Sequence, residues 1–455
     1  MPGRNLAVLL ILFAATGPLW TRTDPFPNPT SAGEAAPAVT PQLATEWRAL
    51  LAQAIRRATA QNPRLREAEA LAEAARRRVP QATVLPDPEV ELGLQDVPLG
   101  DLSLSRDDFT MQRVTGRQRL PGLGKRAALR AMAQADVESA SASRERAVIE
   151  IAADAADAFF QLAESDRSLA ILEESRRRLE DAAASATELY KVGKAAQSDV
   201  LQANLEKTSL DEQMSTLRAE RRMQAARFNA LQGYPANAPV PSIGPVAWTK
   251  ASEAEVPSAA DLVRRAAERS PVVAEAQAQV RRAQQELELA RLERRPDWTL
   301  MGYYGRRQRF DDFVGVSASI DLPWAHRRRL DERRAEKEAE LAAAHAGVEV
   351  VRNQLQGEIE AAYAELDRNL EQARLYRDSI LPQAEINYRA AREAYVVGKI
   401  DFQTLLRAAT QLDTYRREAA ARASGIGRAV AALQKASGLP LIEGTPDSGD
   451  SHAEK

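Results

Sequence analysis

The sequence contains one pattern twice, in the same order, and this internal repeat limits the possible folds more than any other feature. A Tyr-Lys-Val-Gly-Lys segment at 190–194 matches a Tyr-Val-Val-Gly-Lys segment at 395–399. Further matches occur at nearly the same displacement: Asn62-Pro63 with Ser270-Pro271, Asp107-Asp108-Phe109 with Asp311-Asp312-Phe313, Leu120-Pro121 with Leu322-Pro323, and Gly233-Tyr234-Pro235 with Gly438-Leu439-Pro440. Matches that keep one order predict a duplicated structural unit.

The ends of the repeats suggest how the chain is organised. Arg4 is followed by an apolar stretch from Leu6 to Ala15, about half the length that a spanning helix needs, which is typical of a secretory signal. The predicted segments are a signal at 1–22, a proline-rich extended leader at 23–45, a first repeat at 46–235, a linker at 236–257, a second repeat at 258–440 and a disordered tail at 441–455.

Each repeat is predicted to contain a helix, two short strands, a very long helix, a tight turn and another long helix. No proline lies between Pro121 and Pro235, and Gly193 is the only glycine between 125 and 232. This predicts a helix over about 125–190 that reverses at Gly193. In the second repeat, apolar residues over 348–395 recur about every 3.6 residues, the period of a nearly straight helix. Pro382 is expected to bend that helix.

Segments before each long helix alternate apolar and polar residues, the period of a β-strand. The alternation is clear over 90–94, 298–304 and 314–322, and weaker over 109–120. A small soluble sheet with one wet face would show this pattern, and so would strands crossing an outer membrane.

Two features favour the membrane. Trp298 and Trp324 bracket the second strand pair, as interfacial anchors would. The secretory signal would bring the chain to an outer membrane. Arg113, Arg117 and Arg119 share one parity, so they must occupy the lumen face or the headgroup zone. Four strands cannot close a barrel, so several chains would share one.

Composition excludes several classes of function. The chain has no Cys and only 3 His, so thiol nucleophiles, disulfides and structural zinc clusters lose their usual ligands. The net charge of −2 offers no overall attraction to nucleic acid. Gly122-Leu123-Gly124-Lys125 lacks the residues of a phosphate-binding loop. No catalytic, cofactor or metal site is therefore expected, and the protein is predicted not to be an enzyme.

The motifs resemble those of the TolC-like outer membrane efflux channels, in particular the branch that serves heavy-metal pumps of the resistance-nodulation-division (RND) class. The segments that carry the resemblance are 85–88 (Leu-Pro-Asp-Pro), 97–100 (Val-Pro-Leu-Gly), 118–126, 381–385 (Leu-Pro-Gln-Ala-Glu) and the two Tyr-x-Val-Gly-Lys turns. The resemblance implies a mainly α-helical fold with four β-strands per chain. A homotrimer would form a twelve-stranded barrel on a long α-helical tunnel, which a periplasmic adaptor links to an inner-membrane RND pump.

The same resemblance assigns roles to particular residues. It places two turns at the tunnel tip, where the adaptor docks: Val192, Gly193 and Lys194 in the first, and Val397, Gly398 and Lys399 in the second. Where the best-known members carry acidic residues that narrow the entrance, this chain has Thr404 and Arg407. Together with Asp199, these are candidate constriction residues.

The sequence therefore predicts a passive exit duct in the outer membrane that extends into the periplasm and contacts lipid. Heavy-metal cations are the cargo that the resemblance suggests. Two alternatives remain: a soluble periplasmic coiled-coil scaffold, and the adaptor itself. The scaffold would leave the alternating strands without lipid, and the adaptor would carry one helical hairpin between paired β modules rather than a tandem duplicate.

Overall fold

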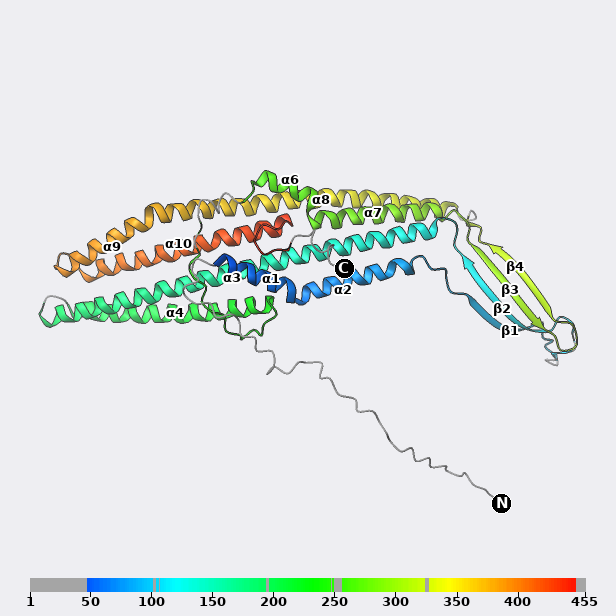
Figure 1. Cartoon of the computed structure of the whole chain (residues 1–455), viewed down its shortest axis with the longest axis horizontal. Coiled ribbons are helices and arrows are strands. Elements are labelled where there is room, and N and C mark those ends of the chain that lie inside the picture. Colours follow the sequence, from blue (N-terminus) through cyan, green and yellow to red (C-terminus); the bar gives the residue numbers. More distant parts are fainter. Residues whose placement is uncertain are drawn as a thin grey trace, which may run out of the picture.

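The computed structural model describes residues 47–100, 104–105, 107–193, 196–246, 248, 256–323 and 327–446. The chain forms a long rod with a four-stranded sheet at one end and two helical turns at the other (Figure 1). In chain order the elements are α1 (Trp47–Gln61), α2 (Pro63–Gln81), β1 (Glu89–Gln95), β2 (Met111–Leu120), α3 (Lys125–Lys191), α4 (Gln197–Leu231), α6 (Ala259–Arg269), α7 (Pro271–Leu292), β3 (Trp298–Arg306), β4 (Phe313–Ile320), α8 (Arg327–Leu375), the π-helical turn η3 (Tyr376–Ile380), α9 (Leu381–Val396) and α10 (Phe402–Ser437).

Both halves follow the predicted order, except that two helices and not one precede each strand pair. The repeated dipeptides, Asn62-Pro63 and Ser270-Pro271, begin the second of these helices in each half. Asn62 accepts a hydrogen bond from the amide of Arg64 (3.0 Å) and is the N-cap of α2, with Pro63 as the first helical residue. Ser270 and Pro271 occupy the same positions at α7. Proline suits this position because its missing N–H would have no helical partner there.

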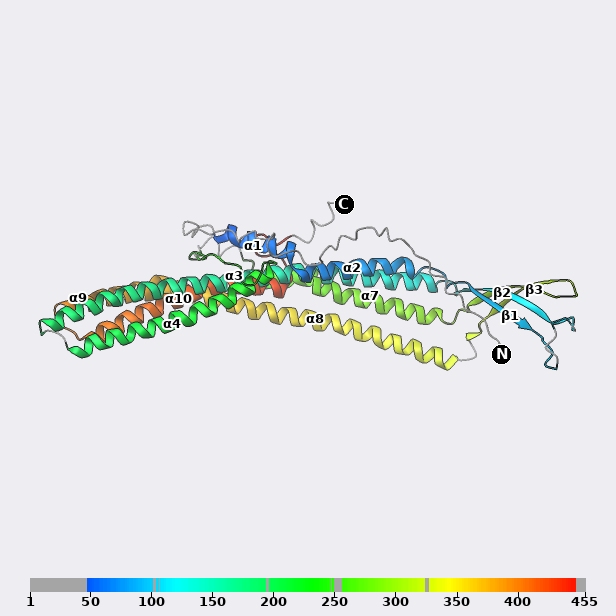
Figure 2. The same ribbon diagram turned by 90° about the horizontal axis from the view of Figure 1, so that it is seen from below.

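The long helix α3 is the axis of the rod. It contacts α1, α2, α4, α7 and α10 along its 67 residues, and α2, α3, α7 and α8 run side by side toward the sheet (Figure 2). Its buried face is rich in alanine: Ala152, Ala155 and Ala156 have no exposed surface. Such small side chains permit close helix approach, so α3 has packing partners over its whole length.

The central core lies where α1 packs on α3. The ring centroids of Trp47 and Phe160 are 5.8 Å apart, and those of Trp47 and Trp248 are 5.2 Å apart. The described part of the linker covers this core, since Ile243 is buried and its amide donates to the carboxylate of Asp166 (2.7 Å). Ala431 of the second half belongs to this core, and Trp248 packs both against it and against a second apolar cluster around Leu262 and Leu433.

The prediction of a nearly straight helix over 348–395 needs correction. The π-helical turn η3 separates α8 from α9 directly before Pro382, and the path bends between these helices (Figure 1). Pro382 has no N–H to donate and its ring crowds the preceding turn, so the helix widens there. The bend predicted at this proline is confirmed.

The tail predicted to be disordered from residue 441 is ordered as far as 446. The side-chain oxygen of Gln434 accepts hydrogen bonds from the amides of Leu441 (2.9 Å) and Ile442 (3.0 Å) and from the hydroxyl of Thr445 (3.2 Å). Gln434 has no exposed surface, and a buried amide oxygen needs donors. The polar composition of the tail concealed this anchor. The rest of the predicted tail, the signal and the leader lie outside the described residues.

The four strands form one antiparallel sheet in the order β1-β2-β3-β4. The two halves therefore meet at the β2–β3 pair, while β1 and β4 are the edges. Among the described helices, none has an apolar stretch that is long enough to cross a membrane.

Candidate membrane, junction and tip sites

One face of the sheet is apolar across all four strands. Residues directly opposite each other in antiparallel strands share a face, and the register aligns Leu92, Val114, Tyr304 and Val314 in one row. A second row joins Val90, Gly116, Gly302 and Val316. Val316 is 83% exposed and Leu92 is 75% exposed. A contiguous exposed apolar face of this kind marks a surface that another phase or molecule covers.

One of the two predicted membrane anchors, Trp298, lies at the helical end of this sheet. Trp298 begins β3, lies opposite Leu120 and Ile320, and therefore shares the apolar face. It is 47% exposed. Trp324 lies outside the described residues.

The opposite face of the sheet is polar and carries the three arginines of β2. Arg117 forms ion pairs with Glu89 (3.6 Å) and Glu91 (3.4 Å), and the guanidinium of Arg113 donates to Gln95 (2.8 Å). The predicted shared parity of these arginines is confirmed, and their face is the one away from the apolar rows. The sheet therefore has one face suited to hydrocarbon and one suited to water.

A carboxylate joins the sheet to the helices. Asp297, between α7 and β3, accepts hydrogen bonds from the amide of Gly122 (2.7 Å) and from the Lys125 ammonium (2.7 Å). Arg119 adds an ion pair at 3.2 Å. Burial alone would raise the pKa of Asp297, but these hydrogen bonds more than offset it and hold the pKa below its ordinary value.

The glycine in this junction is required by space. A Cβ on Gly122 would lie 2.8 Å from the carbonyl oxygen of Pro296. The segment that superficially resembled a phosphate-binding loop is therefore a tight β2–α3 connection that closes onto the α7–β3 connection.

Both predicted tip turns end their helices on a left-handed glycine. Gly193 has φ 72° and Gly398 has φ 71°. In the second turn, Gly398 donates to the carbonyl of Tyr395 (2.9 Å) and Lys399 donates to the carbonyl of Ala394 (2.8 Å), the two bonds of a Schellman motif. The predicted helix reversals at both glycines are confirmed.

The turns expose apolar side chains at the very end of the rod. Val192 is 67% exposed and Val397 is 66% exposed. Both precede their glycine at the helix C-cap, so their side chains project from the tip. Lys194 lies outside the described residues.

The candidate constriction residues lie on the two helices that leave the turns. Asp199 is in the first turn of α4, and Thr404 and Arg407 are exposed on α10. The amide of Thr404 donates to the carboxylate of Asp401 (2.9 Å), the N-cap of α10. Hydrogen bonding by Thr404 lowers the pKa of Asp401, with a smaller effect of the Arg407 charge. Thr404 thus has a structural role in starting α10.

Each turn joins two helices into a hairpin, α3 with α4 and α9 with α10. Next to the turns, these two hairpins share an apolar core. The rings of Tyr395 and Phe402 meet edge to face with centroids 5.6 Å apart, and Leu210 and Met214 of α4 belong to the same cluster. Burial raises the pKa of Tyr395, and the Asp199 charge adds to this effect.

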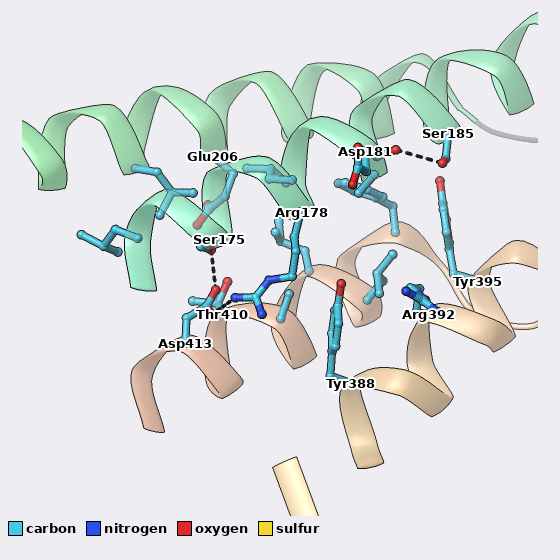
Figure 3. Close-up of a pocket in the computed structure, with 18 of the residues that line it drawn as sticks. Ser175, Arg178, Asp181, Ser185, Glu206, Tyr388, Arg392, Tyr395, Thr410 and Asp413 are labelled. Atoms are coloured by element: carbon cyan, nitrogen blue, oxygen red, sulfur yellow. Dashed lines mark hydrogen bonds and ion pairs between the residues drawn. The ribbon is translucent and has the colours of Figure 1, made fainter. Parts of the chain in front are cut away.

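A partly buried ionic network, which the sequence did not reveal, links α3, α9 and α10. Asp413 of α10 accepts hydrogen bonds from Ser175 and Arg178 of α3 (Figure 3). Arg178 also pairs with Glu174 (3.2 Å), and Glu174 pairs with Arg416 (2.9 Å). Asp413 is only 5% exposed, and burial raises its pKa against the opposing effect of the arginines.

The network continues to α9 and borders a cavity. Arg416 also binds Glu385 of α9 (3.1 Å), so α3, α9 and α10 are joined. A cavity of about 340 Å³ lies between the hairpins, bordered by Arg178, Tyr388 and Tyr395 (Figure 3). In the sequence, the one feature that could have indicated this network is Asp413, a carboxylate next to Leu412 on the buried side of α10.

The arrangement offers packing, charge pairing and exposed surfaces rather than a reaction centre. Within the described ranges, no group of three or more His, Cys, Asp and Glu side chains is placed to hold a metal ion.

Comparison with known proteins identifies relatives of the same shape. The chain is similar to the outer membrane protein VceC from Vibrio cholerae, with 18% identity, a TM-score of 0.72 and coverage of 88% of this chain and 98% of VceC. It is also similar to the CmeC outer membrane channel of Campylobacter jejuni (13% identity, TM-score 0.72, 99% and 97% covered) and to CusC (14% identity, TM-score 0.67, 85% and 91% covered).

These likenesses establish a common fold. A comparison with curated protein sequences gives no match. The profile of the family described as "Outer membrane efflux protein" matches two segments, 54–233 and 262–439, which together make up most of the chain. The chain therefore belongs to the outer membrane efflux protein family.

Proposed function

We propose that this protein is the outer membrane channel of a tripartite efflux system, a passive exit duct that assembles as a homotrimer. The observation that carries the proposal is the sheet, with one apolar face and one charged face, at the end of a helical rod built around the 67-residue helix α3. Family membership supports the outer membrane location.

The sheet edges support assembly. β1 and β4 each have a neighbour on one side only, and unpaired edge groups are not tolerated in hydrocarbon. Three copies would contribute twelve strands to one closed barrel. The apolar rows would then face lipid, and Arg113, Arg117 and Glu91 would line a water-filled lumen.

The tip turns support a docking role. Val192 and Val397 are exposed at the end of the rod away from the sheet, and Lys194 and Lys399 follow them closely in the sequence. A periplasmic adaptor that presents apolar and acidic side chains would fit both turns. An RND-class pump in the inner membrane would deliver the cargo. Heavy-metal cations are proposed as cargo on the sequence resemblance alone.

Asp199, Thr404 and Arg407 are proposed to narrow the periplasmic entrance. Opening would require the hairpins to move relative to each other at the tip. Because Thr404 and Arg407 replace the acidic residues of the best-known members, the entrance would attract cations less strongly than an acidic ring would.

Cross-linking of the tips tests the proposal, and the absence of natural cysteine makes every cross-link assignable. The double variant Val192→Cys with Val397→Cys is inserted in a planar bilayer. We expect a steady conductance when it is reduced and a loss of conductance when the tips are oxidised. Each single variant is the control and should keep its conductance under both conditions.

Fractionation separates the proposal from its alternatives. The mature protein should sediment with outer membranes and need detergent to stay in solution as a trimer. A monomer that is soluble without detergent would instead fit a periplasmic scaffold or adaptor and overturn the proposal.

A further inference from the structure

The junction carboxylate Asp297 has a counterpart in the other repeat, Asp87, which makes no matching contact with the part of the chain that the structure describes. Asp297 follows Pro296 at the start of β3. Asp87 follows Pro86 before β1 in the same way, but it is exposed. The repeat thus places a second Pro-Asp pair directly before the edge strand β1, at the helical end of the sheet.

The groups that Asp297 binds are also duplicated. Lys125 is the first residue of α3, after Leu120-Pro121, and Arg327 is the first residue of α8, after Leu322-Pro323. Lys125 is largely buried against Asp297, whereas Arg327 is exposed. Asp87 and Arg327 belong to the opposite edges of one sheet, so a single chain cannot bring them together.

We propose that β4 of one subunit pairs with β1 of the next in the register that β2 and β3 adopt within the chain, and that Asp87 of the next subunit binds Arg327. This inference rests on the proposed oligomeric channel. It assigns a residue pair and a strand register to the interface between subunits.

The register follows from the β2–β3 template. Gln118 lies opposite Leu300 in the chain. The repeat maps these residues onto Ile320 and Val90, so Val90 of the next subunit would lie opposite Ile320. Both belong to the apolar face, and the apolar rows would therefore continue across the interface without a break.

Other registers fail on physical grounds. A slip by one residue would place the apolar side chains of β1 beside the polar face of β4. A slip by two residues would keep the faces aligned but would move Asp87 about 7 Å along the strand. It would then lose the position that Asp297 holds relative to Lys125.

The charges near this interface fit the same register. Glu89 of the next subunit would lie opposite Asp321, a pair of like charges that needs compensation. Arg117 already pairs with Glu89 (3.6 Å) and Arg119 with Asp321 (3.8 Å), so an arginine stands on each side. Arg327, Arg328 and Arg329 add positive charge where β4 ends. This gives the arginine run a role at the subunit junction.

Disulfide trapping tests the register in the full-length protein. The variant Val90→Cys with Ile320→Cys is oxidised in outer membranes and run on a denaturing gel. We expect covalent dimers and trimers that revert to monomer on reduction. The control Leu92→Cys with Ile320→Cys, slipped by two residues, should give several-fold less product.

An internal control shows whether a disulfide can form between cysteines in this register. Gln118→Cys with Leu300→Cys occupies the template pair itself, so its disulfide should form within one chain and leave the monomer mass unchanged. If this control forms and the Val90–Ile320 pair does not, the register is wrong.

Charge exchange tests the ion pair. Asp87→Arg alone and Arg327→Asp alone should each lower the temperature at which the trimer dissociates, and the double variant should recover most of the loss. No recovery would overturn the pairing of Asp87 with Arg327. A wild-type trimer that conducts but shows neither trapping nor recovery would remove this inference and leave the proposed function intact, whereas a monomeric wild type would remove both.

Discussion

The two halves of the chain contain the same helix-reversing turn, but different helices lead to it. Gly193 and Gly398 have almost the same φ, 72° and 71°. In the first half, α3 reaches its turn without interruption from Lys125 to Lys191. In the second half, the equivalent path is α8, the π-helical turn η3 and α9. The two halves therefore have the same turn at the tip, but only the second half interrupts the helix that leads to it.

The difference indicates which hairpin can move. α3 is packed against five other helices along its length, so it is the fixed reference. In the second half, the equivalent helical path is interrupted by the π-helical turn at Tyr376–Ile380 before Pro382, and helices commonly bend at such turns. A change of bend at η3 would shift the Gly398 turn relative to the Gly193 turn, which is the motion that an opening tip needs.

Removing the ionic link between the hairpins should have the largest effect. Arg178→Ala leaves the buried carboxylate of Asp413 without its main cation and should lower the free energy of unfolding by roughly 3 kcal/mol. Denaturant titration of the helical circular dichroism in detergent measures it. The matched control is Arg227→Ala, whose pair with Asp157 (3.7 Å) is largely exposed and should cost less than about 1 kcal/mol. Equal losses in both variants would show that the network does not join the hairpins.

Loosening the π-helical turn should have a smaller effect, confined to the second hairpin. Tyr376 of η3 donates a hydrogen bond to Glu418 of α10, and this bond raises the pKa of Tyr376 to about 12. Tyr376→Phe should lower the free energy of unfolding by about 1 to 2 kcal/mol. Hydrogen exchange should accelerate at 376–380 and remain unchanged in α3.

The same bond predicts a dependence on alkaline pH. Because the folded pKa lies above the ordinary value of 10, this stabilisation is present below pH 10 and is lost as the pH rises through about 12. The stability difference between wild type and Tyr376→Phe should therefore shrink over that interval. A constant difference would mean that the phenol proton does not hold the turn.

The sequence was sufficient for features that depend on local spacing. Gly193 in a proline-free run located the first turn, the repeated motif located the second at Gly398, and parity placed Arg113, Arg117 and Arg119 on one face. It was insufficient where a polar group has a distant partner. Asp413 binds Ser175 across 238 positions, and Gln434 anchors a tail of polar composition, so neither looked unusual within its own helix. Pro382 predicted a bend, but its position alone did not reveal that the helix widens into the π-helical turn η3.

The turns themselves should respond least and equally. Gly193→Ala and Gly398→Ala meet no atom within 4 Å, so only the left-handed backbone opposes the added methyl group, at about 1 kcal/mol each. Gly357→Ala, in the exposed interior of α8, is the control and should stabilise by up to about 1 kcal/mol because alanine is the better helix former. Thermal unfolding of the three variants measures these shifts. A loss at Gly398 well above that at Gly193 would mean that the interrupted path of α8, η3 and α9 is coupled to its turn. The two halves would then differ at the tip as well as along the helix.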